Sequence, residues 1–407
     1  MHKEKKYSPL EGTIPFLRRT FSGNEDLHPG TIVILLLGLT LAIALRCILV
    51  GYKSQDFFAS LQPWYNTIKS LGFSAFSTDF STYNPPYLYL LYIILRLRPD
   101  TPPVIGVKIP GLIMDFVCAY YVYRIVLMKP IQKDIAMLAG LAVLFAPTVI
   151  VNSAFWGQAD SIYTAALAAC LFYLMSGRNT LAMLAYGAAL AFKLQAVFLA
   201  PFLFALFLRK MLTWKQIFLT PFILILAIVP SWIAGRPVAD LLNIYLYQSS
   251  QFELITMNAP TVYTWIPQTK QVFNLFYLPA IIIGAIVAFL LVAVILKSKV
   301  LLTKHLLLEL ALVAIMAVPF FLPKMHERYF FPADVISIAL AFYFPEFFYF
   351  PVVMSLISFL SYEPYFFNAQ PIPLPILAVG LFFLICILAK HTFTRMYPID
   401  TEQATDP

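Results

Sequence analysis

Long apolar runs, each bounded by polar or basic residues, recur along the whole chain. They lie near residues 31–50, 104–127, 135–151, 160–176, 179–192, 196–208, 216–234, 276–296, 305–322, 333–345, 346–361 and 372–389. An α-helix needs ~20 residues to cross the ~30 Å hydrocarbon core of a bilayer. Backbone polar groups have no water partner at that depth, so such segments must be helical. The pattern predicts an all-α, polytopic transmembrane helical bundle with about 12 spans.

A shorter apolar segment, Pro85–Leu97, begins with two prolines. A run of about 10–14 residues is more typical of an interfacial or re-entrant helix than of a span. Counting it as a span would place Arg124 and Lys133 on the outer side and reverse every downstream helix. We therefore interpret it as an interfacial helix in the first external loop.

Basic residues locate the cytoplasmic side, because cytoplasmic loops carry an excess of Lys and Arg. With the basic turns inside, both termini are cytoplasmic. The predicted domains are a basic cytoplasmic tail at 1–30, a transmembrane domain at 31–390 and a cytoplasmic tail at 391–407. The external loops cover about 51–103, 152–160, 235–275 and 323–334.

Composition supports a membrane protein and changes how the net charge is interpreted. Of the 407 residues, 61% are hydrophobic and 12% are charged, whereas a soluble domain has about 25% charged residues. The net charge of +8 follows from the basic cytoplasmic turns, so no nucleic-acid partner is predicted. The four cysteines have no CxxC spacing, which gives no sign of a zinc site or a disulfide framework.

Asp56 is the first candidate for chemistry. It follows the first apolar run and precedes an amphipathic aromatic stretch, 57–68. A carboxylate at the membrane surface can act as a general base that takes a proton from an attacking hydroxyl. The alternative is that Asp56 is a solvated loop acid.

A second group of candidates lies in the sequence NSAFWGQAD between two apolar runs: Asn152, Trp156, Gln158 and Asp160. Polar groups at membrane depth are costly and indicate function. Trp156 could stack on a sugar, or it could lie at the lipid interface. The neighbouring Gln158 and Asp160 favour a polar pocket over the interfacial alternative.

Further candidates lie near helix ends. Tyr83 and Asn84 precede Pro85, where they could serve architecture or function. Lys108 and Asp115 are seven residues apart on one helix face, too far for a direct pair, so each is expected to meet another partner. Lys193 alone is better explained as a lysine that snorkels to the interface.

The densest charge cluster on the predicted external face is Lys324, His326, Glu327 and Arg328, followed by Asp334. Two cations and a histidine form a natural phosphate site, and arginine binds phosphate oxygens in a bidentate manner. The alternative is an ordinary charged loop. No second histidine is placed to share a metal with His326, so no metal is predicted.

Taken together, these blocks resemble the GT-C fold glycosyltransferases, polytopic enzymes that take a sugar from a polyprenyl-phosphate carrier on the extracytoplasmic face. The resemblance covers most of the chain and is greatest to bacterial mannosyltransferases related to the second mannosyltransferase of GPI-anchor synthesis. It is carried by Asp56, TYNPPYLYLL, KIPGLIMD, NSAFWGQADSIY and LPKMHERYFFPAD.

The resemblance implies roles for individual residues. Asp56 matches the family's acceptor-activating base, Asp160 the acid that shapes the acceptor or sugar site, and His326 with Arg328 the donor-phosphate cluster. It also implies short membrane-parallel helices in the first external loop. The chain lacks an acidic pair beside Asp56, and Ala159 removes any DxD pattern at Asp160, which argues against a bound metal. No cofactor is predicted.

Two hypotheses follow. The first is an inverting, metal-independent hexosyltransferase of the cell envelope, with mannose as the sugar that the resemblance implies. Its partners would be a polyprenyl-phosphate-linked sugar donor, a lipid or glycan acceptor and the bilayer. The second is a transporter or flippase of a lipid-linked or anionic substrate, with Asp115 and Lys193 along a pathway. It would favour internal repeats, and the sequence shows none strong enough to name. A surface-polysaccharide polymerase is a third possibility.

Overall fold

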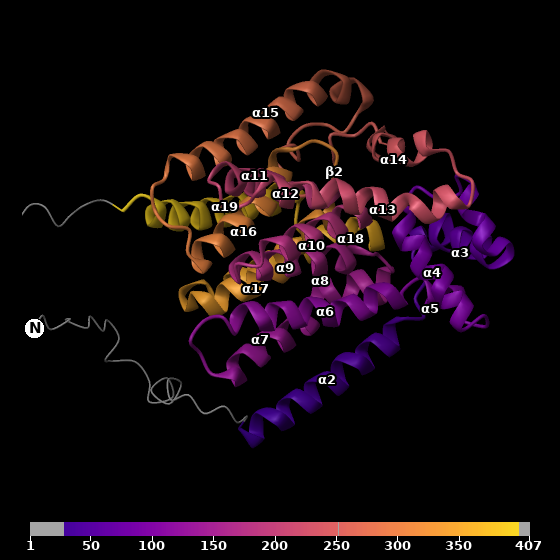
Figure 1. The fold of residues 1–407 in the computed structure, drawn as a ribbon, viewed down its shortest axis with the longest axis horizontal. Coiled ribbons are helices and arrows are strands. Elements are labelled where there is room, and N and C mark those ends of the chain that lie inside the picture. Colours follow the sequence, from indigo (N-terminus) through magenta and orange to yellow (C-terminus); the bar gives the residue numbers. More distant parts are fainter. Residues whose placement is uncertain (1–27, 251, 399–407) are drawn as a thin grey trace, which may run out of the picture.

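The structure is a computed structural model that describes residues 28–250 and 252–398. Most of the predicted tail at 1–30, and the end of the tail at 391–407, lie outside these ranges. Within them the chain is almost entirely helical (Figure 1), which confirms the predicted all-α class. The described strands are β1 (Thr256–Met257) and β2 (Met325–His326), which pair in parallel.

The N-terminal half begins with a long helix and continues through a loop of short helices. Its elements are α2 (Pro29–Leu49), η2 (Phe57–Leu61), α3 (Gln62–Leu71), η3 (Gly72–Ser77), α4 (Pro85–Leu97), α5 (Pro103–Gly106), α6 (Ile109–Val126), α7 (Lys133–Phe145), α8 (Pro147–Ile150), η4 (Val151–Trp156), α9 (Asp160–Met175), α10 (Asn179–Phe192), η5 (Leu194–Leu199) and α11 (Ala200–Leu208). The short segment predicted at 85–97 is present as α4, with the predicted bounds.

The C-terminal half contains longer helices. Its elements are α12 (Trp214–Ile217), α13 (Leu219–Ile233), α14 (Val238–Ser250), α15 (Lys270–Lys297), α16 (Lys304–Phe321), η6 (Glu327–Phe330), α17 (Phe331–Tyr343), η7 (Pro345–Phe347), α18 (Phe350–Phe367) and α19 (Leu374–Met396). The predicted runs at 333–345 and 346–361 correspond to α17 and to a C-terminally shifted α18.

Seven helical segments of the described chain are long and apolar enough to cross a membrane, and a bent pair would make an eighth. The seven are Pro29–Leu49, Pro103–Val126, Trp214–Ile233, Lys270–Lys297, Lys304–Phe321, Pro345–Phe367 and Leu374–Met396. The protein is therefore a multi-pass membrane protein. Helices such as α9, with 16 residues, are shorter than a full span, and the count of 12 stays a prediction.

The run predicted at 135–151 is broken rather than continuous. Helix α7 ends before Pro147, and the chain resumes through α8 and η4 at an angle of 52° to it. Proline has no backbone N–H and its ring clashes with the preceding turn, so the helix cannot pass through it unbent. This break turns residues 152–156 away from the axis of α7, and Trp156 lies against Ser54 and Asp56.

The core lies between α6, α9, α16 and α17, while α2 stands at the edge of the bundle (Figure 1). In the most apolar part of α16, 83% of the residues are buried, against 11% for α2. The mainly apolar exposed face of α2 is suited to lipid. Close packing inside is illustrated by Gly140, where an added Cβ would lie 2.9 Å from the Ala119 carbonyl oxygen of α6.

The segment at 51–103, predicted to be the first external loop, packs as a second small core at one end of the bundle, where α3, α4 and α5 gather (Figure 1). Its buried side chains are a mixture of aliphatic and aromatic groups, with Phe76 edge-on to Tyr89. Tyr89 also hydrogen-bonds Ser231 of α13 at 2.8 Å. This layer of short helices holds the loop against the membrane helices and forms one side of a cavity.

Candidate active site

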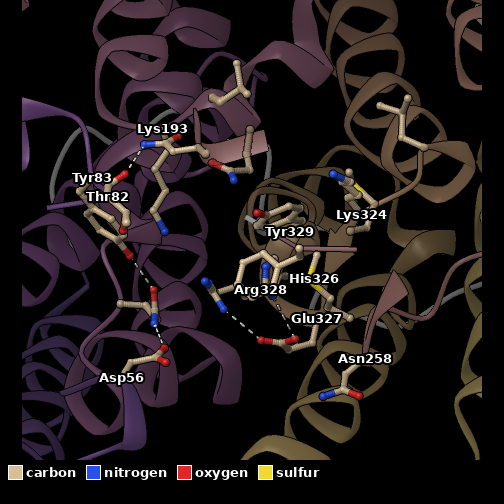
Figure 2. Close-up of a pocket in the computed structure, with 18 of the residues that line it drawn as sticks. Asp56, Thr82, Tyr83, Lys193, Asn258, Lys324, His326, Glu327, Arg328 and Tyr329 are labelled. Carbon is tan, nitrogen blue, oxygen red and sulfur yellow. Dashed lines mark hydrogen bonds and ion pairs between the residues drawn. The ribbon is translucent and has the colours of Figure 1, made fainter. Parts of the chain in front are cut away.

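A cavity of about 650 Å³ lies between the 51–103 segment, η5, the α14–β1 segment, α15 and the β2–η6 segment. Eight of the predicted site residues line it: Asp56, Tyr83, Asn84, Gln158, Lys193, Lys324, His326 and Arg328. They come from parts of the chain that are up to 272 residues apart, from Asp56 to Arg328. Figure 2 shows Asp56 on one side of the pocket and the His326–Arg328 segment on the other.

Asp56 is held in place by hydrogen bonds rather than being free in solvent. Its Oδ2 accepts hydrogen bonds from Trp156 Nε1 at 2.9 Å and from Gln158 Nε2 at 2.6 Å. Its backbone N–H donates to the Tyr365 hydroxyl at 2.9 Å. Tyr83 extends the network by donating to Gln158 Oε1 at 2.9 Å. The interpretation of Asp56 as a merely solvated loop acid is wrong, because its carboxylate is part-buried and doubly hydrogen-bonded.

The backbone around Trp156 explains how both donors reach the same carboxylate. The π-helical segment η4 ends at Gly157, whose φ of +86° is in the left-handed region that favours glycine. The N–H groups of Gly157 and Gln158 both donate to Asn152 O, at 3.1 and 2.8 Å. A π-helical turn is often found at functional sites. Here the turn and the glycine reverse the chain, so the residues on both sides of Gly157 face Asp56.

The opposite wall is built on the β1–β2 pair. Lys324 has a φ of +61°, and its N–H donates to Ile255 O at 2.7 Å. The turn brings the Lys324 ammonium over the rings of Phe273 and Tyr277, at 4.8 Å from each centroid. Cation–π contacts of this kind hold an ammonium while leaving it charged. Lys324 thus presents a cation at the α15 side of the cavity.

Arg328 belongs to the same side of the cavity as Lys324 and His326, and these three residues form its basic wall. Its Nη1 contacts Glu327 Oε1 at 3.1 Å, and its guanidinium carbon lies 5.3 Å from the Trp156 ring centroid. Its Nε lies 3.8 Å from Asp160 Oδ2. Burial alone would lower the pKa of Arg328, but the two carboxylates outweigh it and raise the pKa above its ordinary value. The guanidinium therefore stays charged at every accessible pH.

His326 and Glu327 form a coupled pair beside it. Burial lowers the pKa of His326 below its ordinary value of 6.5, although Glu327 Oε2 lies only 3.8 Å from His326 Nδ1. Burial would raise the pKa of Glu327, but His326 and Arg328 outweigh it and the pKa is lowered. At neutral pH the pair therefore consists of a neutral imidazole and an ionised carboxylate.

Lys193, which lines the cavity, forms an ion pair with Asp160, which lies behind the cavity wall. Lys193 Nζ lies 2.6 Å from Asp160 Oδ1, and Asn152 Nδ2 donates to Asp160 Oδ2 at 2.8 Å. The same ammonium lies 5.2 Å from the centroid of the Tyr83 ring. The expectation that Lys193 snorkels is wrong, because its charge is directed to a fully buried carboxylate.

Four predicted substrate-binding residues do not line the cavity. Asn152, Trp156 and Asp160 have no exposed surface and Lys108 has 2%. Direct contact between these four residues and a substrate does not fit this placement, because cavity-lining side chains cover them. Trp156 and Asp160 instead hold residues that do line the cavity, Asp56 and Lys193 respectively. The Asn152 side chain donates to Asp160, and Lys108 donates to backbone carbonyl oxygens.

Lys108 and Asp115 have separate partners, as their spacing predicted. Asp115 Oδ2 lies 2.8 Å from Arg46 Nη2, and Ser153 and Ser161 donate to its two oxygens at 2.6 and 2.5 Å. Lys108 instead donates to backbone carbonyl oxygens. The role of Arg46 as the partner of Asp115 was not foreseen, because nothing local distinguishes it from an ordinary membrane-embedded arginine.

Tyr365 and Asn258 are among the cavity-lining residues that were missed as site candidates. Tyr365 contacts Asp56 across 309 positions of sequence and stacks on Trp156 with ring centroids 4.5 Å apart. Nothing in an aromatic-rich chain marks this tyrosine. Asn258, which has a φ of +56° and bridges to His326, also lines the cavity. The left-handed backbone conformation of Asn258 is the feature that sets it apart, and the sequence does not show that conformation.

Comparison with known proteins identifies the fold. No protein-family model and no curated protein sequence matches the chain. Crystal structures of ArnT from Cupriavidus metallidurans, one bound to undecaprenyl phosphate and one in the apo state, both match with a TM-score of 0.52 at 12% sequence identity. The matches cover 89% and 90% of this chain and 78% of each ArnT chain.

ArnT is a GT-C glycosyltransferase, and the chain therefore has the GT-C fold that the resemblance predicted. At this level of identity the match establishes the fold alone. The relation to the mannosyltransferases of GPI-anchor synthesis stays a prediction.

Proposed function

We propose that this protein is a membrane glycosyltransferase that moves a hexose from a polyprenyl-phosphate sugar to an acceptor hydroxyl. The observation that carries the proposal is the pairing of Asp56, held by Trp156 and Gln158, with the Arg328 cluster across one cavity. A base and a phosphate-binding wall are what this transfer needs. The ArnT structure with bound undecaprenyl phosphate supports a lipid-linked donor for this fold.

Asp56 serves as the general base. Trp156 and Gln158 both donate to Oδ2, which holds the carboxylate in one orientation, and Oδ1 is the oxygen that takes the proton. The acceptor hydroxyl loses its proton to Asp56 as its oxygen bonds to the anomeric carbon. The bond from that carbon to the phosphate oxygen breaks, and the phosphate leaves with the electron pair. Attack from the opposite face inverts the anomeric configuration.

The basic wall stabilises the charge that develops on the leaving phosphate. Arg328 offers a planar fork of N–H donors, which suits phosphate oxygens. Lys324 adds a second cation, and neutral His326 adds a hydrogen-bonding ring nitrogen. Fixed donors that are aimed at developing charge lower the barrier without reorganising. A phosphate is a good leaving group, so no acid on this wall is required.

Trp156 links the two halves of the site. Its Nε1–H holds Asp56, and the Arg328 guanidinium lies 5.3 Å from its ring centroid. Although Trp156 cannot touch a substrate, it fixes the position of the base relative to the principal phosphate-binding cation. Precise spacing of this kind matters, because small misplacements of reacting groups cost large factors in rate.

The transport alternative is less well supported. Asp115 and Lys193, the charges proposed for a pathway, are engaged by Arg46 and Asp160. Asp115 has no exposed surface. We therefore favour catalysis, with the cavity on the extracytoplasmic side and both termini cytoplasmic.

The test is sugar transfer by the full chain in nanodiscs. Radiolabelled polyprenyl-phosphate-mannose is the donor, a membrane lipid extract is the acceptor, and EDTA is present throughout. Wild type is compared with Asp56→Asn, which keeps the shape but removes the base, and with Asp100→Asn, an exposed acid of the same loop. We expect Asp56→Asn to lose about 10²–10⁴-fold in rate, whereas Asp100→Asn retains full activity.

Each outcome has a definite meaning. Transfer that survives in folded Asp56→Asn would remove the base from the mechanism and keep the enzyme class. Transfer from another polyprenyl-phosphate hexose, but not from the mannose donor, would correct the sugar. Absence of transfer from every polyprenyl-phosphate sugar would overturn the proposed function.

A further inference from the structure

Lys108 has an unusual environment for a buried lysine. Its ammonium lies within hydrogen-bonding distance of four backbone carbonyl oxygens: Val50 at 3.0 Å, Tyr52 at 2.7 Å, Ala154 at 2.8 Å and Phe155 at 3.0 Å. The side chain is only 2% exposed. An ammonium has three N–H donors, and here it has four acceptors around it. The arrangement is like that of carbonyl oxygens around a bound cation.

The electrostatics of the cage account for a charge in this place. No carboxylate of the described residues forms an ion pair with Lys108, and burying an unpaired charge is costly. The compensation comes from two helix ends. Val50 and Tyr52 follow the C-terminus of α2, and Ala154 and Phe155 lie in the last turn of η4. The C-terminal ends of helices carry partial negative charge that favours a cation.

The two helix ends joined by Lys108 lead directly to Asp56 and its hydrogen-bond donors. The segment after Tyr52 reaches Asp56 within four residues, and Phe155 is followed at once by Trp156. A second link joins the same segments, since Ser54 Oγ donates to the Trp156 carbonyl oxygen at 2.9 Å. Lys108 therefore lies where the two segments join. This junction sets the position of Asp56 relative to its hydrogen-bond donors, Trp156 and Gln158.

The fit around the lysine stem is close. A Cβ added at Gly157 would lie 3.3 Å from Lys108 Cε, so the left-handed turn and the lysine stem occupy adjoining space. The side chain does not reach the cavity, and it cannot touch substrate there.

We infer that Lys108 is a positioning residue that locks the Asp56 segment to the Trp156–Gln158 segment through a carbonyl cage. This inference rests on the proposed function of Asp56 as the base. Without the ammonium, the carbonyl oxygens of the two helix ends face one another uncompensated and move apart. Asp56 then loses the alignment of both donors, whereas the phosphate-binding wall on β2 and η6 is unaffected.

Lys129 provides a matched control at the other end of α6. Its ammonium also contacts two backbone carbonyl oxygens, Phe342 at 3.2 Å and Tyr343 at 2.9 Å. The 18 residues of α6 separate the two lysines by about 27 Å at 1.5 Å per residue. Lys129→Met removes the same kind of interaction far from the cavity.

The experiment measures transfer and donor binding separately in nanodiscs. We expect Lys108→Met to lower kcat by about 100-fold, comparable to a lost transition-state contact. Binding of polyprenyl phosphate, measured by tryptophan quenching or calorimetry, should stay within about threefold of wild type, because its wall is intact. Lys129→Met should lower kcat by less than threefold.

Chemical rescue gives a readout that a general structural role would not produce. In Lys108→Ala, propylammonium added to the buffer should restore activity at least tenfold, whereas neutral propanol at the same concentration should not. Rescue by a free ammonium would show that the charge in the cage is what the site needs.

A second readout does not depend on catalysis. The fluorescence of Trp156 is isolated by subtracting the spectrum of Trp156→Phe, and we expect Lys108→Met to shift this emission to the red. If wild type transfers no sugar, the proposed function fails while this measurement still tests the cage.

Several results would overturn the inference. They are full activity in folded Lys108→Met, an equal loss of polyprenyl-phosphate binding, an unchanged Trp156 emission, or no response of Lys108→Ala to propylammonium. Failure of Lys108→Met, Lys108→Ala and Lys108→Arg to fold, while Lys129→Met folds, would assign the cage to stability alone.

Discussion

Two buried ion pairs in this protein use similar chemistry and differ in what lies beside them. In the first, Arg46 of α2 pairs with Asp115 of α6; in the second, Lys193 pairs with Asp160 of α9. Both carboxylates have no exposed surface. The first pair lies among helices, whereas Lys193 of the second lines the cavity.

The partners of each carboxylate explain the difference. Asp115 has one cation and accepts hydrogen bonds from Ser153 and Ser161. Asp160 has two cations near it, Lys193 at 2.6 Å and Arg328 at 3.8 Å. Arg328 also pairs with Glu327 at 3.1 Å, so two cations and two carboxylates meet at the cavity, where Lys193 and Arg328 are within reach of an anionic group. We therefore expect the Arg46–Asp115 pair to support the scaffold and the Asp160 cluster to support the proposed site.

The largest expected effect is on the scaffold pair. Asp115→Asn leaves Arg46 as an uncompensated buried charge, which should destabilise the protein by about 3–5 kcal/mol. Thermal and denaturant unfolding in detergent would measure this loss, and the protein that remains folded should transfer sugar normally. Unchanged stability, or a selective loss of activity, would show that the Arg46–Asp115 pair belongs to the site.

The next effect is on the site. Arg328→Gln should lower the rate of transfer by about 10²–10³-fold, because one charged donor to the leaving phosphate is lost. Stability should change less than in Asp115→Asn, because cavity water can reach the region of Arg328. Arg328→Lys keeps the charge but not the bidentate fork and should recover part of the rate. Equal rates of transfer by Arg328→Gln and wild type would show that Arg328 does not bind the leaving phosphate.

Asp160→Asn tests the comparison most directly. The variant leaves Lys193 without its carboxylate, but the cavity can hydrate the ammonium, so we expect a stability loss of only about 1–3 kcal/mol. Transfer should fall by roughly 10–100-fold, because both cations lose the group that sets their positions. A stability loss as large as that of Asp115→Asn, with unchanged transfer, would make the two pairs equivalent.

The smallest effect concerns His326 and pH. Because its folded-state pKa lies below the ordinary 6.5, the unfolded chain binds the proton first as the pH falls. Stability is therefore lost as the pH falls from 6.5 toward the folded-state pKa. His326→Gln should have a flatter dependence of Tm on pH over this window, measured above the range where Glu327 titrates. Identical slopes would show that His326 is not held neutral.

Much of the helical framework could be predicted because its causes are local. Apolar runs long enough to span a bilayer must form helices there, whatever they pack against. Pro85 and Pro86 suit the first turn of a helix, and α4 begins at Pro85 with the predicted bounds. The break at Pro147 has an equally local cause but was not predicted, because the apolar pattern continues through it.

Candidate residues could be found from the sequence more readily than their partners. Charged residues stand out in a chain with 12% charged residues, which marked Asp56, Lys193 and Arg328. Whether Lys193 snorkels or pairs with Asp160 depends on which way two helix ends face, and no local pattern encodes that direction. The same holds for Trp156, which is recognisable as special but is placed behind the cavity wall by the turn at Gly157.

By itself, the sequence determined that this is a helical membrane protein and where its polar chemistry is concentrated. Those features depend on hydrophobic length and on the cost of polar groups in lipid, which are properties of single segments. Only the tertiary structure decided that Asp56 meets Trp156 and Tyr365 and that Lys108 lies in a carbonyl cage. Asp56 and Tyr365 are 309 positions apart, and every residue carries a backbone carbonyl that could accept from Lys108. The packing of the helices therefore decides which of these groups meet.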